Sequence, residues 1–142
     1  MGIDANDLEI REPVQKDDGT HYFGQWVKGS DSKAGRGIAI LQDGSLYEGF
    51  WKDDQHHGTG RWIYSTKDVY QGKFKAGMAK GFGVFLSHTG GKSKGYYKNG
   101  KLHGQGYETW QDGSSYKGDF KNGMKDGTGK FSWVDAVSTL RL

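Results

Sequence analysis

Rings and glycines alternate with polar residues along much of the chain, at a spacing of two. In the stretch YKGDF, which begins at Tyr116, two polar residues separate a tyrosine, a glycine and a phenylalanine. Side chains two apart project from the same face of a β-strand. The pattern therefore predicts a short strand with one face of rings and glycine and one polar face.

The same pattern occurs five times. Each unit begins with a tyrosine, or with Ser93 in one case, followed by a glycine after two residues and a ring after four. The units begin at residues 22, 47, 70, 93 and 116, so the last four starts are 23 residues apart. The first unit is 25 residues long, because SDSKA after Gly29 adds two residues. A fixed period of this length is the signature of a repeat protein.

Each unit continues with a second predicted strand. A turn rich in Gly, Asp and Asn follows the first strand, and the chain then reads Gly-x-Gly-x-ring-x-ring, as in GTGRWIY. Between units stands a tight-turn dipeptide such as Asp43-Gly44, which favours a two-residue hairpin connection. Each unit is therefore a predicted β-hairpin, and the hairpins join into one antiparallel meander.

Composition explains what would hold such hairpins together. Leu, Ile, Val and Phe account for only 25 of the 142 residues, whereas glycine alone also accounts for 25. A glycine within a strand usually marks the close approach of another group. Because the glycines share a face with the rings, a tyrosine or tryptophan from a neighbouring strand can lie over each of them. Cross-strand aromatic contacts contribute roughly 0.2 to 1 kcal/mol each, so an array of them replaces an aliphatic core.

The motif Y-x-G-x-(W/F)-x-x-G, then G-x-G, then DG, at a step of 23 residues, resembles the MORN repeat family. The resemblance covers residues 20 to 135, and the wording of the units is similar to that of the multi-repeat MORN proteins of single-celled eukaryotes. It implies an all-β fold, an elongated single-layer twisted antiparallel meander of hairpins. The chain departs from the motif at Asp54, Lys67, Ser93 and Asp135-Ala136.

The expected organisation has three parts. Residues 1–12 are an N-terminal tail with a turn of helix at most. Residues 13–136 are the array, in which a half repeat at 13–21 supplies a closing strand before the five units. Residues 137–142 are a C-terminal tail or cap.

The aromatic face is the largest candidate surface for a protein partner. Its predicted members are Tyr22, Trp26, Tyr47, Trp51, Tyr70, Phe74, Tyr97, Tyr116 and Phe120. The alternative is that these rings only hold the sheet together. A single-layer sheet has nothing behind it, however, so rings can also remain available to a partner helix or strand. The opposite face is polar, with Phe23, Phe50 and Tyr96 as interruptions.

A column of lysines occupies one equivalent position in four successive units. It consists of Lys52, Lys75, Lys98 and Lys121. Each lysine near an anionic membrane contributes about 1 kcal/mol, which favours weak and salt-sensitive contact with anionic lipid. The alternative is a solvated hairpin shoulder that discourages edge pairing.

Other chemistry finds little support in the sequence. The chain has no cysteine, so a metal site would have to use histidines such as His56, His57 and His103. His57 and His103 are equivalent positions about 20 Å apart and cannot share one ion, so we expect no metal site. The G-x-G pairs lack a third glycine, so we expect no cofactor and no catalytic residues. No apolar run is long enough for a transmembrane helix. No RNP-like motif occurs, so we expect no nucleic-acid partner despite a sequence pI near 9.0.

These observations favour a non-enzymatic scaffold that binds a protein partner along its aromatic face. The resemblance implies a cytoplasmic place in a cytoskeletal, ciliary or membrane-adjacent assembly. The second hypothesis is a module that binds a phospholipid or phosphoinositide surface and regulates an associated lipid kinase. An enzyme is the third and least supported hypothesis. The partner and the oligomeric state are left open.

Overall fold

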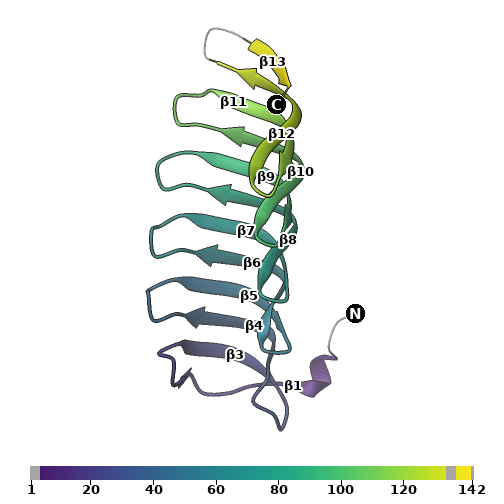
Figure 1. Cartoon of the computed structure of the whole chain (residues 1–142). Helices are drawn as coiled ribbons and strands as arrows, with labels where there is room; N and C mark the ends of the chain where they lie inside the picture. The colour runs from purple at the N-terminus through teal and green to yellow at the C-terminus, as the bar shows by residue number, and fades with distance from the viewer. Residues whose placement is uncertain (1–3, 134–136, 142) are drawn as a thin grey trace.

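The computed structural model describes residues 4–133 and 137–141, and all its strands belong to one open antiparallel sheet (Figure 1). From β3 to β13 the strands follow one another in the order of the chain, while β1 and β2 both pair with β3. The strands are β1 (Leu8–Ile10), β2 (Val14–Gln15), β3 (His21–Val27), β4 (Lys33–Ile40), β5 (Leu46–Lys52), β6 (Gln55–Ile63), β7 (Val69–Lys75), β8 (Met78–Leu86), β9 (Lys92–Lys98), β10 (Lys101–Thr109), β11 (Ser115–Lys121), β12 (Met124–Ser132) and β13 (Val137–Arg141). The predicted all-β single-layer meander is confirmed.

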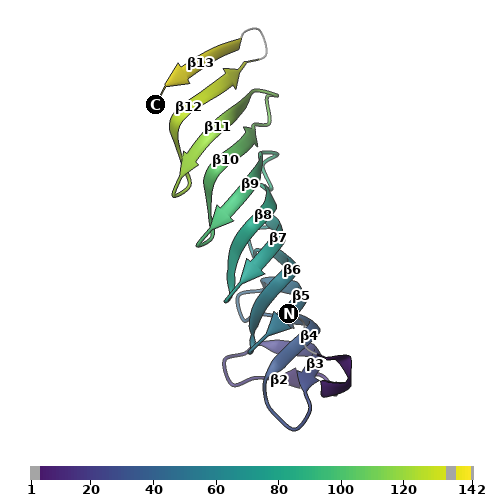
Figure 2. The ribbon, with the colours of Figure 1, turned by 90° about the vertical axis from the view of Figure 1, so that its right-hand side faces the viewer.

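Each predicted unit forms one pair of strands, from β3 and β4 in the first unit to β11 and β12 in the fifth. The turns within units lie along one side of the sheet and the turns between units along the other (Figure 1). Seen from the side, the ribbon twists steadily along its length (Figure 2). Such a twist is the usual result of the right-handed twist of each strand. No helix among the described residues is long and apolar enough to cross a membrane.

Ten glycines form a row across strands β3 to β12. Neighbours in this row stand directly opposite each other: Gly24, Gly37, Gly49, Gly60, Gly72, Gly83, Gly95, Gly106, Gly118 and Gly129. A Cβ atom on Gly72 would lie 2.5 Å from the Cα atom of Gly83, closer than real Cβ atoms approach. The row therefore has no room for side chains, which leaves space for rings from the flanking positions.

The second strand of each unit contains a bulge. In β6, three residues separate His56 from Gly60, whereas in β5 only Phe50 separates their partners. Gly58 within this bulge has a φ angle of +74°, which glycine adopts without strain. The bulge places His56 opposite Trp51. The equivalent residues of the other units are Lys33, Ala79, Leu102 and Lys125.

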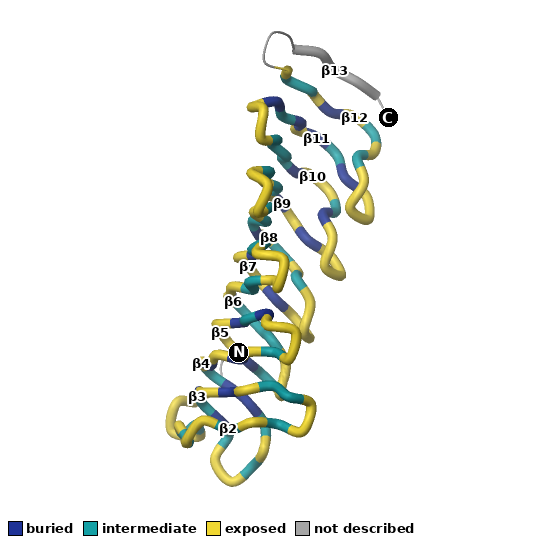
Figure 3. Tube along the Cα trace, turned by 90° about the vertical axis from the view of Figure 1, so that its left-hand side faces the viewer, coloured by how far each residue is buried: buried dark blue, intermediate teal, exposed yellow. Residues whose placement is uncertain are grey.

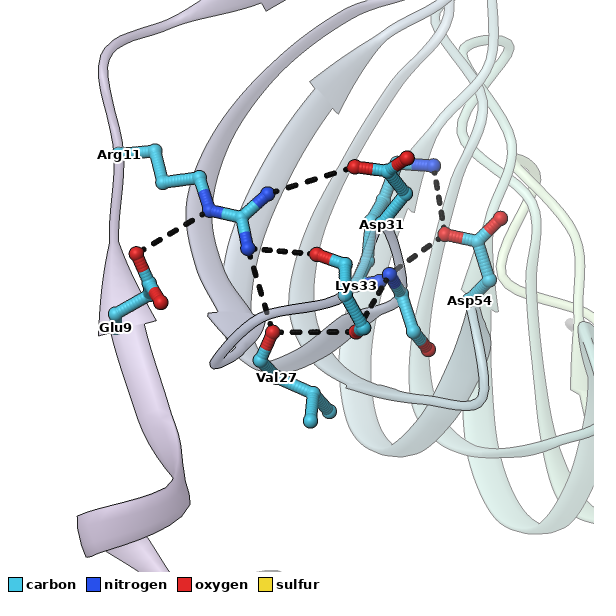
Figure 4. A network of polar contacts seen from close by, with 8 residues as sticks. Glu9, Arg11, Val27, Asp31, Lys33 and Asp54 are labelled. Carbon is cyan, nitrogen blue, oxygen red and sulfur yellow. Dashed lines mark hydrogen bonds and ion pairs between the residues drawn. The ribbon is translucent and has the colours of Figure 1, made fainter.

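The first edge of the sheet is covered by residues that we expected to form a tail. A 3-10 turn at Ala5–Asp7 leads into β1, where Leu8 pairs with Val27 of β3. The guanidinium of Arg11 donates hydrogen bonds to the carbonyl oxygens of Val27, at 3.3 Å, and Ser30, at 2.6 Å (Figure 4). The helical turn is present, but strand β1 was not foreseen.

Strands at both ends protect the array. β2 pairs Val14 with Tyr22, at the same edge of the sheet as β1. At the other end β13 pairs Val137 with Ser132 and continues to Arg141 opposite Thr128. Terminal units of a repeat stack need such covering, because each unit contacts only its neighbours. The departure at Asp135-Ala136 and the expected array boundary at residue 136 lie outside the described residues.

Candidate functional site

The buried positions follow the middle of the strands as a band along the whole array (Figure 3). They belong to one face of the sheet, here called the inner face, which carries the rings of Tyr22, Tyr47, Tyr70 and Tyr116. Each of these rings occupies the space where the opposite glycine has no side chain; a Cβ on Gly83 would lie 2.5 Å from Cε2 of Tyr70. The predicted packing of rings on glycine is confirmed.

Each tyrosine also leans along its own strand. The hydroxyl of Tyr47 donates a hydrogen bond to the carbonyl oxygen of Phe50, at 2.7 Å, and Tyr70 bonds Lys73 in the same way at 3.0 Å. The rings of Tyr47 and Trp51 consequently meet edge to face, with centroids 5.2 Å apart. Four residues of extended strand span about 13 Å, so the contact depends on the glycine between the two rings.

Edge-to-face contacts continue from one unit to the next. The ring of Tyr22 lies 5.3 Å from that of Trp51, and the ring of Tyr70 lies 5.0 Å from that of Tyr97. Contacts of this geometry contribute about 0.5 to 1.5 kcal/mol each beyond the burial of area. Ser93 interrupts the series, because it replaces the tyrosine that would stand between Tyr97 and the fifth unit.

The structure brings together all nine rings that the sequence indicated as a partner surface. They are between 0% and 8% exposed: Tyr22, Trp26, Tyr47, Trp51, Tyr70, Phe74, Tyr97, Tyr116 and Phe120. Their side chains form the core of the sheet and leave little area for a partner to touch. Binding of a partner along this face stays a prediction, and the contacts would have to come from the residues around the nine rings.

A second group of rings lies beside this core and was not assigned a role from the sequence. These rings come from the second strands and the turns after them: Trp62, Tyr64, Phe85, Trp110, Phe131 and Trp133. They contact one another, with Tyr64 within 5.8 Å of Trp62 and 6.1 Å of Phe85. Tyr64 and Trp133 are 40% and 48% exposed. The ring-x-ring ending of the second and fifth units, in WIY and FSW, was the signal for this rim of the inner face.

The residue after each turn projects onto the rings from the bulge. In the first unit this residue is Lys33, only 7% exposed, whose ammonium lies 5.5 Å from the ring centroid of Tyr22 and 5.6 Å from that of Trp51. The carboxylate of Asp54 accepts hydrogen bonds from the Lys33 ammonium, at 3.0 Å, and from its backbone N–H, at 3.1 Å (Figure 4). Asp54, a departure from the repeat motif, therefore has a structural role.

The fifth unit repeats this arrangement with different residues. The ammonium of Lys125 lies 5.1 Å from the ring centroid of Trp110 and 5.4 Å from that of Tyr116. Its carboxylate partner is Glu108, at 2.7 Å. A cation over aromatic faces gains electrostatic energy from the rings, and the carboxylate accepts its N–H groups.

In the second unit the equivalent residue is His56. Its ring stacks on Tyr47 with centroids 3.7 Å apart and planes 6° apart, and it meets Trp51 edge to face at 4.7 Å. It also contacts Trp62 at 5.0 Å and Phe74 at 5.7 Å. Burial, assisted by the charge of the neighbouring lysine, lowers the pKa of His56 to about 4. The imidazole is therefore neutral at physiological pH.

The comparison with known protein families identifies the repeat. The sequence model of the MORN repeat matches residues 47–69, 70–92, 94–115 and 116–136, which is well over half of the chain. The chain belongs to the MORN repeat family. MORN repeats are non-enzymatic modules that generally mediate interactions with proteins or membranes. The match begins at residue 47, although residues 22–46 have the same strand pairing as the later units.

Other comparisons add little. No protein with a curated description matches the chain. Among solved structures, one similar fold is the TCP domain of SAS-4 (dCPAP) from Drosophila melanogaster, solved in complex with a proline-rich motif of Ana2 (dSTIL). It is 11% identical, the match covers 92% of this chain and 77% of that one, and the TM-score is 0.48. A similarity at this level carries no argument about function.

The lysine column occupies one edge of the MORN array. Lys52, Lys75, Lys98 and Lys121 are the last residues of β5, β7, β9 and β11. They therefore stand at the turns within the repeats, all along the same side of the sheet. The structure brings them to one side, as predicted, and no ion pair of theirs occurs among the described residues.

The outer face of the MORN array, opposite the tyrosine rings, has a shallow groove near its N-terminal end. The groove has a volume of about 790 Å³ and includes Phe23, Ile38 and Phe50. The guanidinium of Arg36 lies 5.1 Å from the centroid of the Phe50 ring. These apolar residues interrupt a face that the sequence predicts to be mostly polar.

His56 and His103 lie in different repeats, on β6 and β10. His56 is stacked among rings, and Nδ1 of His103 accepts a long hydrogen bond from the backbone N–H of Asn122, at 3.4 Å. Across residues 4–133 and 137–141, no group of three or more His, Cys, Asp or Glu side chains could hold a metal ion.

Proposed function

We propose that the chain is a non-enzymatic scaffold that binds a protein partner along the inner face of its MORN array. The observation that carries the proposal is the rim of partly buried rings beside the fully packed core. The described strands all lie in one sheet, so no second layer covers this rim. Large rings with one free face are typical of protein interfaces, where aromatic residues and methionine are enriched.

The rigidity of the array supports the proposal. Ten strands, β3 to β12, held by ring-on-glycine packing present the rim without the ordering cost that a flexible surface incurs on binding. Exposed side chains on the rim include Tyr64 and, near it, Met78. A partner strand or helix that lies along the array would contact several repeats at once. Residues 22–46 act in this proposal as a divergent first repeat.

The test is affinity capture from extract of the source cells with two matched variants. Tyr64→Ser removes an exposed ring from the inner rim, whereas Tyr96→Ser removes an exposed ring, 59% exposed, from the outer face. We expect a partner that binds wild type and Tyr96→Ser, and binds Tyr64→Ser roughly tenfold or more weakly, as for an interface hot spot. Failure to capture any protein, or loss of binding only in Tyr96→Ser, contradicts the proposal.

A second candidate function rests on the lysine column. Four lysines along one edge support weak contact with anionic phospholipid or phosphoinositide, at about 1 kcal/mol each before nearby aspartates reduce it. In that case the array would regulate an attached lipid kinase at a membrane. Sedimentation with vesicles of phosphatidylserine and phosphatidylcholine tests this function. Binding that disappears when the four lysines are changed to glutamate supports it, and no binding by wild type removes it.

The cellular place of the scaffold is part of the proposal. The resemblance to other MORN arrays supports a cytoplasmic site in a cytoskeletal, ciliary or membrane-adjacent assembly. Fluorescence microscopy of the tagged chain in its source cells, beside a tubulin marker, tests this placement. A signal confined to the nucleus contradicts it.

A further inference from the structure

The five units place different side chains in the space over their rings. Whether this side chain is charged depends on whether a carboxylate lies beside it. Lys33 and Lys125 are each paired with a carboxylate, from Asp54 and Glu108. In the second and fourth units the positions equivalent to both carboxylates hold neutral residues. The filling side chains there, His56 and Leu102, are also uncharged at physiological pH. The space over the rings of a unit is here called its cage. A cage that has a carboxylate beside it thus holds an ammonium, and a cage without a carboxylate holds a neutral side chain.

The third unit has the cage but no side chain to fill it. Its residue at the filling position is Ala79, opposite Phe74. A cavity of about 290 Å³ lies beside Ala79. The two carboxylate positions hold Trp62 and Gly100, and the described lining includes no charged residue. By the rule of the other units, this cage suits a neutral group.

The walls of this cavity match the surroundings of His56. The four rings around His56 belong to Tyr47, Trp51, Trp62 and Phe74. Each has an aromatic counterpart 23 residues later in the lining of the cavity: Tyr70, Phe74, Phe85 and Tyr97. The third unit therefore keeps every wall that encloses a flat ring in the second unit.

Two polar groups of the lining residues lack partners. The hydroxyl of Tyr97 and Nε1 of Trp62 are buried and form no hydrogen bond within the part of the chain that the structure describes. Tyr97 is more than nine-tenths buried. Buried polar groups normally have partners, and those without one mark places where a ligand or water supplies it. A ligand that brings a hydrogen-bond acceptor together with a ring would satisfy them.

We propose that the cavity beside Ala79 accepts a neutral aromatic side chain of a protein partner, stacked on Tyr70 as His56 stacks on Tyr47. The backbone carbonyl groups of the partner are then available to the Tyr97 hydroxyl. The size of the cavity suits one or two side chains rather than a larger ligand. The inference deepens the proposed scaffold function and rests on it, since it names what the inner face receives.

The test uses amino-acid amides as probes and NMR as the measurement. N-acetyl-L-phenylalaninamide and N-acetyl-L-tryptophanamide are titrated into the whole chain, with N-acetyl-L-leucinamide and N-acetyl-L-lysinamide as comparisons. We expect the aromatic amides to shift the Ala79 methyl signal and to bind roughly three- to tenfold more tightly than the other two. No shift at high probe concentration, or a preference for the lysine amide, overturns the proposal.

Variants locate the site. Ala79→His copies the filling of the second unit and should abolish the shifts. Gln71→His introduces the same residue on the opposite face of the sheet, and we expect it to leave binding unchanged. Ala79→Leu copies the fourth unit and serves if the histidine variant does not fold. Equal binding of the amides by wild type and a folded Ala79 variant places the probes elsewhere and rejects the site.

The outcomes also separate this inference from the wider proposal. If Tyr64→Ser loses the captured partner but the amides do not bind wild type, the scaffold stands and the ring-accepting cavity is rejected. If the amides bind but no partner is captured by the inner face, the cavity is real and the scaffold proposal fails.

Discussion

At the scale of single residues, the space over nearly every glycine in the row belongs to a ring, and Leu102 takes this place at Gly95. This explains why glycine, which weakens ordinary strands, occurs at the centre of every strand from β3 to β12. Each tyrosine combines three contacts: its face covers a glycine, its edge meets a second ring, and its hydroxyl donates to a backbone carbonyl. Changing one residue of this set should therefore lower the free energy of unfolding by more than the buried area of that residue alone suggests.

Two glycine substitutions isolate this effect. Gly83→Ala places a methyl group within 2.5 Å of the Tyr70 ring, whereas the Cβ of Gly91→Ala would lie 3.5 Å from its nearest neighbour. Neither glycine has a positive φ angle, so backbone strain is not a factor. We expect Gly83→Ala to lower the free energy of unfolding by about 2 kcal/mol and Gly91→Ala to change it by less than about 0.5 kcal/mol. Urea denaturation compares the two variants. Equal effects on the free energy of unfolding would contradict the packing of the Tyr70 ring over Gly83.

The neutral, partly buried His56 makes stability depend on pH. Its pKa is lowered to about 4 in the folded chain, while in the unfolded chain it is near its ordinary value of 6.5. The unfolded state therefore binds the proton more readily, and stability should fall as the pH decreases from about 6.5 toward 4. The expected loss is about 3 kcal/mol. Thermal denaturation across this range measures it.

His56→Leu is the matched control for this pH dependence, because leucine fills the equivalent place in the fourth unit. The variant should lose the part of the slope between pH 6.5 and 4 that belongs to the imidazole. An unchanged slope in His56→Leu would show that other groups cause the dependence.

At the scale of strands and hairpins, the carboxylate paired with Lys33 or Lys125 links neighbouring repeats. Asp54 stands in the turn of the second unit and holds Lys33 of the first. Asp54→Gly restores the usual glycine at a position with a φ angle of +66° and so relieves strain, but it leaves the ammonium without its carboxylate. We expect the second effect to win, with a net loss of about 1 to 3 kcal/mol in the free energy of unfolding.

The double variant Lys33→Leu with Asp54→Gly distinguishes the two effects. It keeps the relieved turn and replaces the lysine by the residue type of the fourth unit. Its stability should return to that of wild type or exceed it, as measured by the midpoint of urea denaturation. A double variant as unstable as Asp54→Gly alone would mean that the ion pair is not the cause.

The hairpins themselves were predictable from sequence, because their turns and their period of two are local signals. The unforeseen features depend on residues far apart in the chain. Strand β1 is held by Arg11, which bonds carbonyl groups of Val27 and Ser30. The placement of Lys33 and His56 over the rings depends on a bulge, which shifts the faces of the strand after the turn. A strict alternation of faces assigned the nine rings correctly to one side, but it could not show that their packing buries them.

At the scale of the whole molecule, the packing produces an array without a closed interior. Each strand packs its rings and glycines against its two neighbouring strands, so the sheet needs no second layer. The described ends of the sheet are covered by β1, β2 and β13. Such an object supports contact along its length. A fold of this kind also explains how one alanine in one repeat can create a cavity that the other repeats fill themselves.

Small-angle X-ray scattering of the monomeric chain tests the open array most directly. Twelve paired strands about 4.8 Å apart extend over more than 50 Å, and the longer strands, at about 3.3 Å per residue, add a width of about 30 Å. A flat ribbon of these dimensions has a radius of gyration of roughly 18 Å. A compact domain of the same number of residues would have a radius of gyration of about 14 to 15 Å. For the open array we expect the larger value, with an elongated distance distribution. A value near that of a compact domain would contradict it.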